Sequence, residues 1–99
     1  MKIVAVTACP TGIAHTYMAA EKLQRAAEAM GHEIKVETQG AMGLENEISA
    51  AEASACDAVV FAVDIEVEQR ERFEGKPIVE VSVRDAIKDP ESVIRRLAP

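Results

Sequence analysis

The sequence predicts an α/β fold in which a small open sheet of four parallel strands carries helices on both faces. Short apolar runs rich in β-branched residues alternate with helical stretches along the whole chain, and this alternation is typical of parallel sheets. The length of 99 residues suits a single domain spanning residues 1–99. An apolar fraction of 48% and a charged fraction of 28% are ordinary for a globular protein.

The first half of the chain contains two predicted strands and one long helix. Lys2 to Ala8 is a nearly continuous apolar run, as expected of a strand buried on both faces. A helix is predicted from Ala14 to Met30, because apolar residues recur at helical spacing and Gly31 can cap its end. Residues 33–38 alternate between polar and apolar, which predicts a strand half open to solvent at a sheet edge. Gly40 to Gly43 is predicted to be a loop, either a plain connector or a mobile contact for partner proteins.

The second half of the chain alternates in the same way. A helix opens where Ser49 and Glu52 have the spacing of a capping box. Ser82 and Asp89-Pro90 mark two further helix starts, because proline suits the first helical position. A general-acid role for Asp89 is the alternative. The predicted elements are a helix over residues 49–55, a strand over 57–63, a short helix over 67–73, a strand over 77–81 and two C-terminal helices.

Charge and cysteine usage exclude several classes of protein. A net charge of −6 argues against nucleic acid as the main partner. Apolar runs such as residues 58–63 are far shorter than the roughly 20 residues of a membrane span, and no signal-peptide pattern precedes them. We therefore expect a cytoplasmic protein. Cys9 and Cys56 lack the spacing of a zinc site, so we expect neither a metal nor an organic cofactor.

The segment that begins at Cys9 joins a buried strand to a helix N-terminus. Unpaired N–H groups and partial positive charge at such a point bind an oxyanion and stabilise a thiolate. Cys9 is therefore either a nucleophile that takes up a phosphoryl group or a small apolar residue that ends the strand. Both the dinucleotide fingerprint and the Walker motif are absent. The predicted phosphate-binding loop comprises Pro10, Thr11, Gly12, Ile13, Ala14, His15 and Thr16.

Residues 6–21, V-T-A-C-P-T-G-I-A-H-T-Y-M-A-A-E, closely resemble the active-site segment of a known family. This family is the IIB component, fructose family, of the bacterial phosphoenolpyruvate:sugar phosphotransferase system. The resemblance implies that Cys9 accepts a phosphoryl group from a phosphohistidine of the IIA component. It also implies transfer to fructose or a similar sugar bound by the membrane component IIC. The resemblance continues through V-E-T-Q-G at 36–40, A-V-D at 62–64 and R-F-E-G-K-P at 72–77.

Low-molecular-weight tyrosine phosphatases have a similar loop, in which an arginine follows the cysteine after five residues. His15 stands at that position here, followed by Thr16. Arginine would hold the phosphate through two hydrogen bonds, whereas histidine offers one donor, so we predict a long-lived phosphocysteine. Two alternatives stay open: a cysteine phosphatase acting on small phosphoesters, and a non-catalytic anion-binding module with an inert Cys9.

The roles of the remaining polar residues are less specific. Asp64 follows the third predicted strand on the same sheet edge as Cys9, and it could order the phosphate loop or cap the next helix. Cys56 is interpreted as a small buried residue and His32 as a solvated turn residue. The acidic run over residues 66–74 is interpreted as a solvated helix face. Exposed apolar residues around Cys9 are the natural candidates for partner docking.

Overall fold

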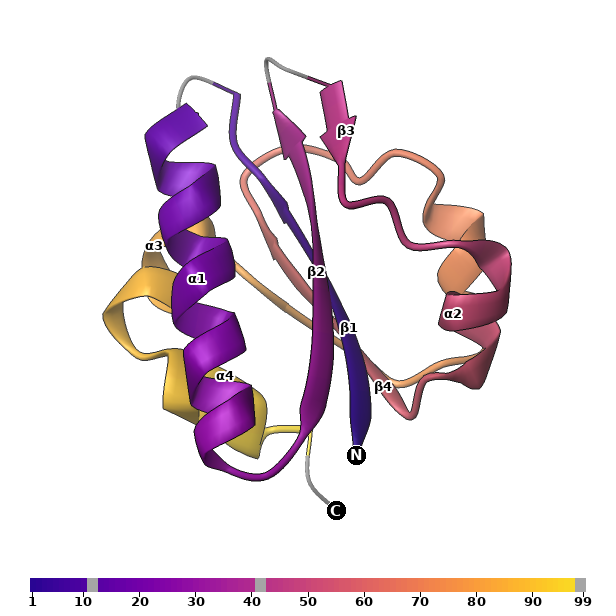
Figure 1. Cartoon of the computed structure of the whole chain (residues 1–99). Coiled ribbons are helices and arrows are strands. Elements are labelled where there is room, and N and C mark those ends of the chain that lie inside the picture. Colours follow the sequence, from indigo (N-terminus) through magenta and orange to yellow (C-terminus); the bar gives the residue numbers. More distant parts are fainter. Residues whose placement is uncertain (11–12, 41–42, 98–99) are drawn as a thin grey trace.

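The computed structural model describes residues 1–10, 13–40 and 43–97 (Figure 1). No helix in these ranges is long and apolar enough to cross a membrane. The elements are, in chain order, β1 (Lys2–Ala8), α1 (Ile13–Ala29), β2 (Glu33–Gly40), β3 (Gly43–Glu45), α2 (Ala50–Ala55), β4 (Ala58–Val63), the 3-10 helix η1 (Arg70–Phe73), β5 (Ile78–Val81), α3 (Val83–Lys88) and α4 (Pro90–Arg95).

The sheet is mixed and has five strands in the order β3-β2-β1-β4-β5, where four parallel strands were expected. Strands β2, β1, β4 and β5 run parallel, and β3 pairs with β2 in the antiparallel direction. The prediction of a loop from Gly40 to Gly43 is therefore wrong at both ends, because Gly40 of β2 pairs with Gly43 of β3. Ala41 and Met42 lie outside the described residues. A strand of three residues that begins with glycine is too short to show a period of two in the sequence.

Strand β2 is not the half-exposed edge strand that its alternating sequence predicted. It lies between β1 and β3, and its C-terminal half is buried on both faces. Three consecutive polar side chains, those of Glu37, Thr38 and Gln39, are all buried there. The alternation failed as a guide because Glu37 and Gln39 have buried polar partners, which no local sequence pattern reveals.

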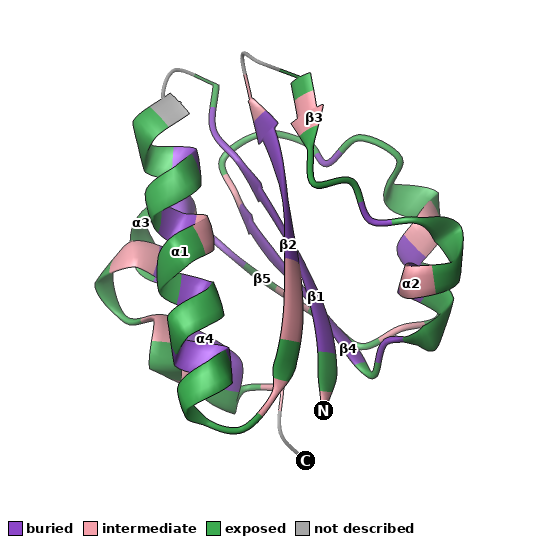
Figure 2. Cartoon of the chain, viewed as in Figure 1, coloured by how far each residue is buried: buried purple, intermediate pink, exposed green. Residues whose placement is uncertain are grey.

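Helices cover both faces of the sheet, as predicted (Figure 1). Helices α1, α3 and α4 pack on one face, where Leu23, Val60 and Ile94 belong to one apolar cluster. Helix α2 and η1 cover the other face, where the rings of Phe61 and Phe73 meet edge to face with their centroids 5.4 Å apart. Figure 2 shows that burial is concentrated in the sheet and on the inner sides of the helices. Both layers hold β1 in the middle of the molecule.

The predicted helix starts are confirmed by their caps. The Ser49 hydroxyl accepts a hydrogen bond from Glu52 N–H, and the Glu52 carboxylate accepts one from Ser49 N–H, which completes the capping box. Ser82 caps α3, and Asp89 caps α4 with Pro90 at the first turn, so Asp89 acts as a helix cap. The helix predicted over residues 67–73 is shorter than expected. Only η1 forms there, preceded by Gln69 in a left-handed conformation.

The four parallel strands end at one edge of the sheet, which we call the carboxyl edge. Cys9 follows β1, Gly40 ends β2, Asp64 follows β4 and Ser82 follows β5. Helix α1 also begins at this edge, at the top of the view in Figure 1. Open α/β sheets bind ligands at this edge, so the fold gathers the candidate residues where a site is expected.

Candidate functional site

Cys9 lies in the middle of the carboxyl edge, directly after the central strand. Its neighbour Ala8 is in register with Gln39 of β2 and with Val63 of β4. The carbonyl of Ala8 accepts a 2.9 Å hydrogen bond from Asp64 N–H, which joins the ends of β1 and β4. Cys9 itself is 8% exposed. The cysteine is thus held by the sheet and reaches the surface only over a small area.

A hollow of about 220 Å³ opens over Cys9 between three segments of the chain. The first segment is the end of β1, the second is the end of β2, and the third connects β4 to η1. We call this space the Cys9 hollow. All three segments therefore meet beside Cys9 at the carboxyl edge. The lining residues are Cys9, Pro10, Gln39, Gly40, Ile65, Glu66 and Glu68.

The start of α1 is anchored against the same edge. The Thr7 hydroxyl donates a 3.1 Å hydrogen bond to the carbonyl of Thr16, whose side chain is buried. A Cβ atom on Gly40 would lie 4.0 Å from Thr16 Oγ1, so β2 and α1 come close together here. His15 is exposed on the first turn of α1. Of the predicted phosphate loop, Thr11 and Gly12 lie outside the described residues, and the backbone of Ile13 and all of Ala14 lie in α1.

Asp64, which follows β4, contacts the start of α3 beside its N-cap Ser82. Its Oδ1 accepts a 3.3 Å hydrogen bond from the N–H of Val83, the first residue of α3. This contact is not the predicted one, because the next helix along the chain is η1, whose N-cap is Gln69. Asp64 also lines a second hollow of about 500 Å³ together with His15, Met18 and Arg84. We call it the α1–α3 hollow; it brings two sequence-predicted residues, His15 and Asp64, to one surface.

A buried ion pair that no sequence pattern predicted contacts Gln39, one of the residues that line the Cys9 hollow. Arg72 binds Glu37 through two bonds, Nη1 to Oε1 at 2.7 Å and Nη2 to Oε2 at 3.0 Å. The Glu37 side chain is fully buried and that of Arg72 is 8% exposed. Ile48 N–H adds a 2.7 Å bond to Oε1, and Gln39 Nε2 adds a 2.6 Å bond to Oε2. Four hydrogen bonds therefore hold one carboxylate.

The environment of Glu37 keeps it ionised. Burial acts to raise the pKa of this carboxyl, but hydrogen bonds from Arg72, Gln39 and Ile48 and the charge of Arg72 outweigh it and lower the pKa. Glu37 and Arg72 are 35 positions apart, so no helix or strand pattern could pair them. The only signal in the sequence is that they belong to the segments 36–40 and 72–77, which resemble the same family.

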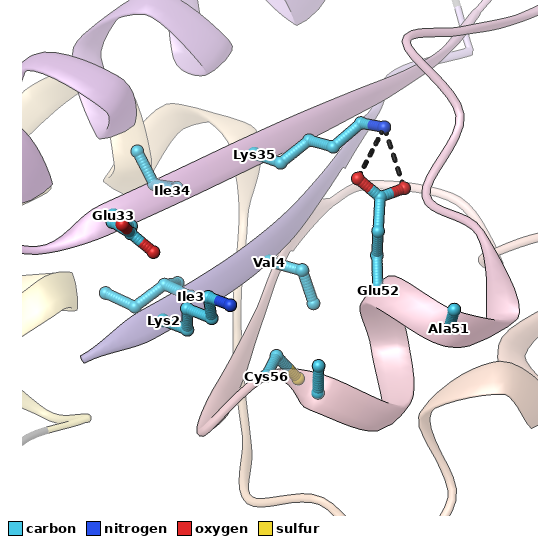
Figure 3. A pocket seen from close by; sticks show the side chains of 10 residues that line it. Lys2, Ile3, Val4, Glu33, Ile34, Lys35, Ala51, Glu52 and Cys56 are labelled. Atoms are coloured by element: carbon cyan, nitrogen blue, oxygen red, sulfur yellow. Dashed lines mark hydrogen bonds and ion pairs between the residues drawn. The ribbon is translucent and has the colours of Figure 1, made fainter.

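A further hollow, of about 360 Å³, lies at the opposite end of the sheet, near the amino ends of β1 and β2 (Figure 3). Lys35 reaches across it and binds both oxygens of Glu52 at 2.8 and 2.9 Å. Hydrogen bonds from Lys35 and Ser49 lower the pKa of Glu52 to about 2. Cys56 lines this hollow at 3% exposure, and its thiol donates a 3.1 Å hydrogen bond to the carbonyl of Ala53.

Cys56 is the small buried residue that the sequence predicted. Burial raises the pKa of its thiol, which makes the reactive thiolate harder to form. No disulfide joins Cys56 to Cys9. His32 is half-buried, not fully solvated as expected, and its Nδ1 lies 3.0 Å from the Met1 nitrogen. Within the described ranges, no group of three or more histidine, cysteine or acidic residues could hold a metal ion.

This chain is similar to known proteins over almost its whole length. The family described as "PTS system, Lactose/Cellobiose specific IIB subunit" matches residues 4–96. The "PTS system fructose-like EIIB component 2" of Escherichia coli K12 is 52% identical over 96 residues, covering 97% of this chain and 91% of the relative. The "Fructose-like PTS system EIIBC component" of the same organism is 44% identical over 99 residues, which are 98% of this chain and 20% of the relative.

Solved structures agree with these relatives. The crystal structure of a domain from the fructose-specific IIABC component of Borrelia burgdorferi superposes with a TM-score of 0.93 at 46% identity. The match covers 97% of this chain and 91% of that domain. The fold and the sequence therefore point to the same group of proteins.

Proposed function

Because this chain belongs to the IIB components of the phosphoenolpyruvate:sugar phosphotransferase system, fructose family, we propose that Cys9 is the residue that carries its phosphoryl group. The chain is a phosphoryl carrier in sugar uptake. The observation that supports Cys9 is its place after the central strand, where it lines the Cys9 hollow shortly before the start of α1. Cys56 is buried at the other end of the sheet.

In the proposed reaction, the Cys9 thiolate attacks the phosphorus of a phosphohistidine on the IIA component. The S–P bond forms as the N–P bond breaks, and the electron pair of the broken bond stays on the histidine nitrogen. Backbone N–H groups between Thr11 and Thr16 receive the phosphoryl oxygens, and the positive end of α1 offsets their charge. Thr11 and Gly12, which belong to this loop, lie outside the described residues.

In the second step, a sugar hydroxyl on the IIC component attacks the phosphorus in line and the S–P bond breaks. The hydroxyl proton is released, and Cys9 returns to the thiolate. Fructose or a fructose-like sugar is the proposed acceptor, in keeping with the names of the relatives. The relative whose name joins EIIB and EIIC fits a partnership in which IIC recruits this cytoplasmic unit, residues 1–99, to the membrane.

Asp64 has a supporting part in this proposal. Its bond to Val83 N–H fixes the start of α3 beside the α1–α3 hollow, and its own N–H fixes the end of β1. A carboxylate would repel a phosphoryl group, so contact with the phosphate is not part of its role. The phosphatase alternative is not favoured, because His15 stands where such enzymes have an arginine that holds the phosphate.

Intact-mass spectrometry tests the proposal. The protein is incubated with phosphoenolpyruvate, the general phosphotransfer proteins and a fructose-type IIA component. We expect one added phosphoryl group on the wild type and on Cys56→Ser, and none on Cys9→Ser. Cys56→Ser is the matched control, because it removes the other thiol while its hydroxyl can still donate to the Ala53 carbonyl.

Uptake of a phosphoryl group by Cys9→Ser would contradict the assignment of Cys9. Failure of the wild type with every member of a panel of active IIA components would contradict the carrier reaction itself. Turnover of a chromogenic phosphoester would then be measured, and a positive result would establish the phosphatase alternative.

A further inference from the structure

The side-chain amide of Gln39 joins the end of β2 to the segment that follows β4. Its Oε1 accepts a 2.9 Å hydrogen bond from Glu68 N–H, and its Nε2 donates a 3.2 Å bond to the Glu68 carbonyl. The amide thus satisfies the donor and the acceptor of one residue, as a neighbouring β-strand would. Gln39 is 3% exposed. A buried polar side chain in this setting holds the backbone that it contacts.

The ion pair between Glu37 and Arg72 fixes the orientation of the Gln39 amide. Glu37 is held ionised, so its carboxylate can only accept, and it takes a 2.6 Å hydrogen bond from Gln39 Nε2. An amide rotated by half a turn would place Oε1 against that carboxylate. Arg72 completes the arrangement, since Nη2 donates a 3.1 Å bond to the same Glu68 carbonyl that Gln39 contacts. The backbone at Glu68 is therefore held by two side chains.

The segment anchored in this way forms one wall of the Cys9 hollow. Ile65, Glu66 and Glu68 line the hollow together with Gln39. The wall is tied to β1 at one end, where Asp64 N–H binds the Ala8 carbonyl. At the other end it is tied to β2, where Gln39 binds Glu68. Its place relative to Cys9 thus depends on a bond at each end.

We propose that Gln39 is a positioning residue for phosphoryl transfer at Cys9, because it fixes the wall against which a partner protein approaches the sulfur. The inference rests on the proposed function and adds to it a residue that does not itself touch the phosphoryl group. A segment that is no longer held has to be ordered when a partner protein docks on it, and this ordering costs binding free energy. A displaced wall therefore weakens productive docking of the IIA component.

The test uses Gln39→Met, which keeps a side chain of similar length but loses every hydrogen bond of the amide. The matched control is Gln24→Met, the same change at an exposed position on α1. We expect hydrogen exchange at Glu68 N–H to accelerate by about tenfold in Gln39→Met and to stay unchanged in the control. We expect the KM for phosphorylated IIA to rise by about fivefold or more, with a smaller change in kcat.

A residue that only stabilised the fold would change neither kinetic constant at a temperature at which both variants are folded. If Gln39→Met does not fold, Gln39→Asn replaces it, because its amide stays polar but is one methylene too short to reach Glu68. Kinetic constants equal to those of Gln24→Met overturn the proposal, whatever the exchange shows. A wild type that takes up no phosphoryl group contradicts the proposed function instead. In that case an unchanged rate of Cys9 alkylation by iodoacetamide in the variant overturns the positioning role.

Discussion

His15 lies on the first turn of α1, exposed to solvent, at the position where the similar loop of low-molecular-weight tyrosine phosphatases has an arginine. His15→Arg is therefore expected to leave the fold intact. We expect the lifetime of the isolated phosphocysteine to fall by about tenfold or more, because guanidinium donors stabilise the charge of the transition state for attack by water. The measurement is the rate at which the phosphorylated protein loses the added mass in buffer.

His15→Lys is the control for this prediction. It adds a positive charge without the planar pair of donors, so a shortened lifetime in the arginine variant alone identifies geometry as the cause. An unchanged lifetime in His15→Arg would contradict the prediction that His15 prolongs the lifetime of the proposed phosphocysteine.

The residues of the site differ in how far the sequence could predict them. Cys9 could be found because it stands between a buried apolar strand and a helix start, and both are local patterns. Glu37 and Gln39 could not, because polar residues at alternate positions of a strand normally face water. In the folded protein Glu37 is paired with Arg72 and Gln39 is hydrogen-bonded to the backbone of Glu68, and these contacts offset the cost of burying the two polar side chains. A partner remote in the sequence leaves no trace in a local pattern.

At the scale of elements, the Glu37–Arg72 pair ties β2 to η1 and predicts a loss of stability in acid. The pKa of Glu37 is lower in the folded protein than in the unfolded chain, so the unfolded chain takes up the proton first. The stabilisation is complete above the ordinary carboxyl value of 4.5 and is lost as the pH falls through the lower pKa of the folded protein. Urea unfolding between pH 7 and the acid range measures this loss.

Glu37→Gln is expected to destabilise the protein by about 3–5 kcal/mol at pH 7, because Arg72 stays buried without its counter-charge. Its free energy of unfolding should then fall less steeply with acid than that of the wild type. The pKa of Glu52 is also lowered, so Glu52 contributes to the pH dependence as well. Glu52→Gln is therefore the control, because it removes that contribution and leaves the Glu37–Arg72 pair intact. If the free energy of unfolding of Glu37→Gln fell with acid as steeply as that of the wild type, the ion pair would not be the cause of the lost stability.

Elements with local signals were predicted, and elements defined by tertiary contacts were not. Ser49, Ser82 and Asp89 each cap a helix that the sequence indicated. Strand β3 exists through its pairing with β2, and the Tyr17 hydroxyl of α1 hydrogen-bonds to Glu45 at its end. Helix η1 forms only the last part of the helix predicted over residues 67–73, and the ring of its final residue Phe73 packs against Phe61. Contacts of this kind form only in the folded chain, so no local sequence pattern predicts them.

At the scale of the whole molecule, the described structure separates two ends of one sheet. The carboxyl edge carries Cys9 and both adjoining hollows. The amino end carries Cys56 and the Lys35–Glu52 pair. Several large exposed apolar side chains lie at the first end. They are Tyr17 and Met18 on α1 and Ile65 beside Cys9, which are 39%, 44% and 40% exposed.

This distribution predicts that partners dock on the carboxyl edge and that Ile65 contributes to the contact. Ile65→Ser is expected to raise the KM for phosphorylated IIA by about fivefold, because an exposed apolar side chain that lines the Cys9 hollow would be buried in a complex formed there. Ile78→Ser is the matched control. Ile78 is 37% exposed, close to the value for Ile65, but it begins β5 at the opposite end of the sheet.

Both isoleucines are exposed, so their substitution should change the free energy of unfolding by about 0.5 kcal/mol or less, and KM then reports docking. Equal KM values for the two variants would contradict a docking surface at the carboxyl edge. The double variant Gln39→Met/Ile65→Ser tests whether the two residues act through the same segment. If Gln39 acts by holding the segment that contains Ile65, the two effects share one cause, and the double variant should raise KM by less than the product of the single changes.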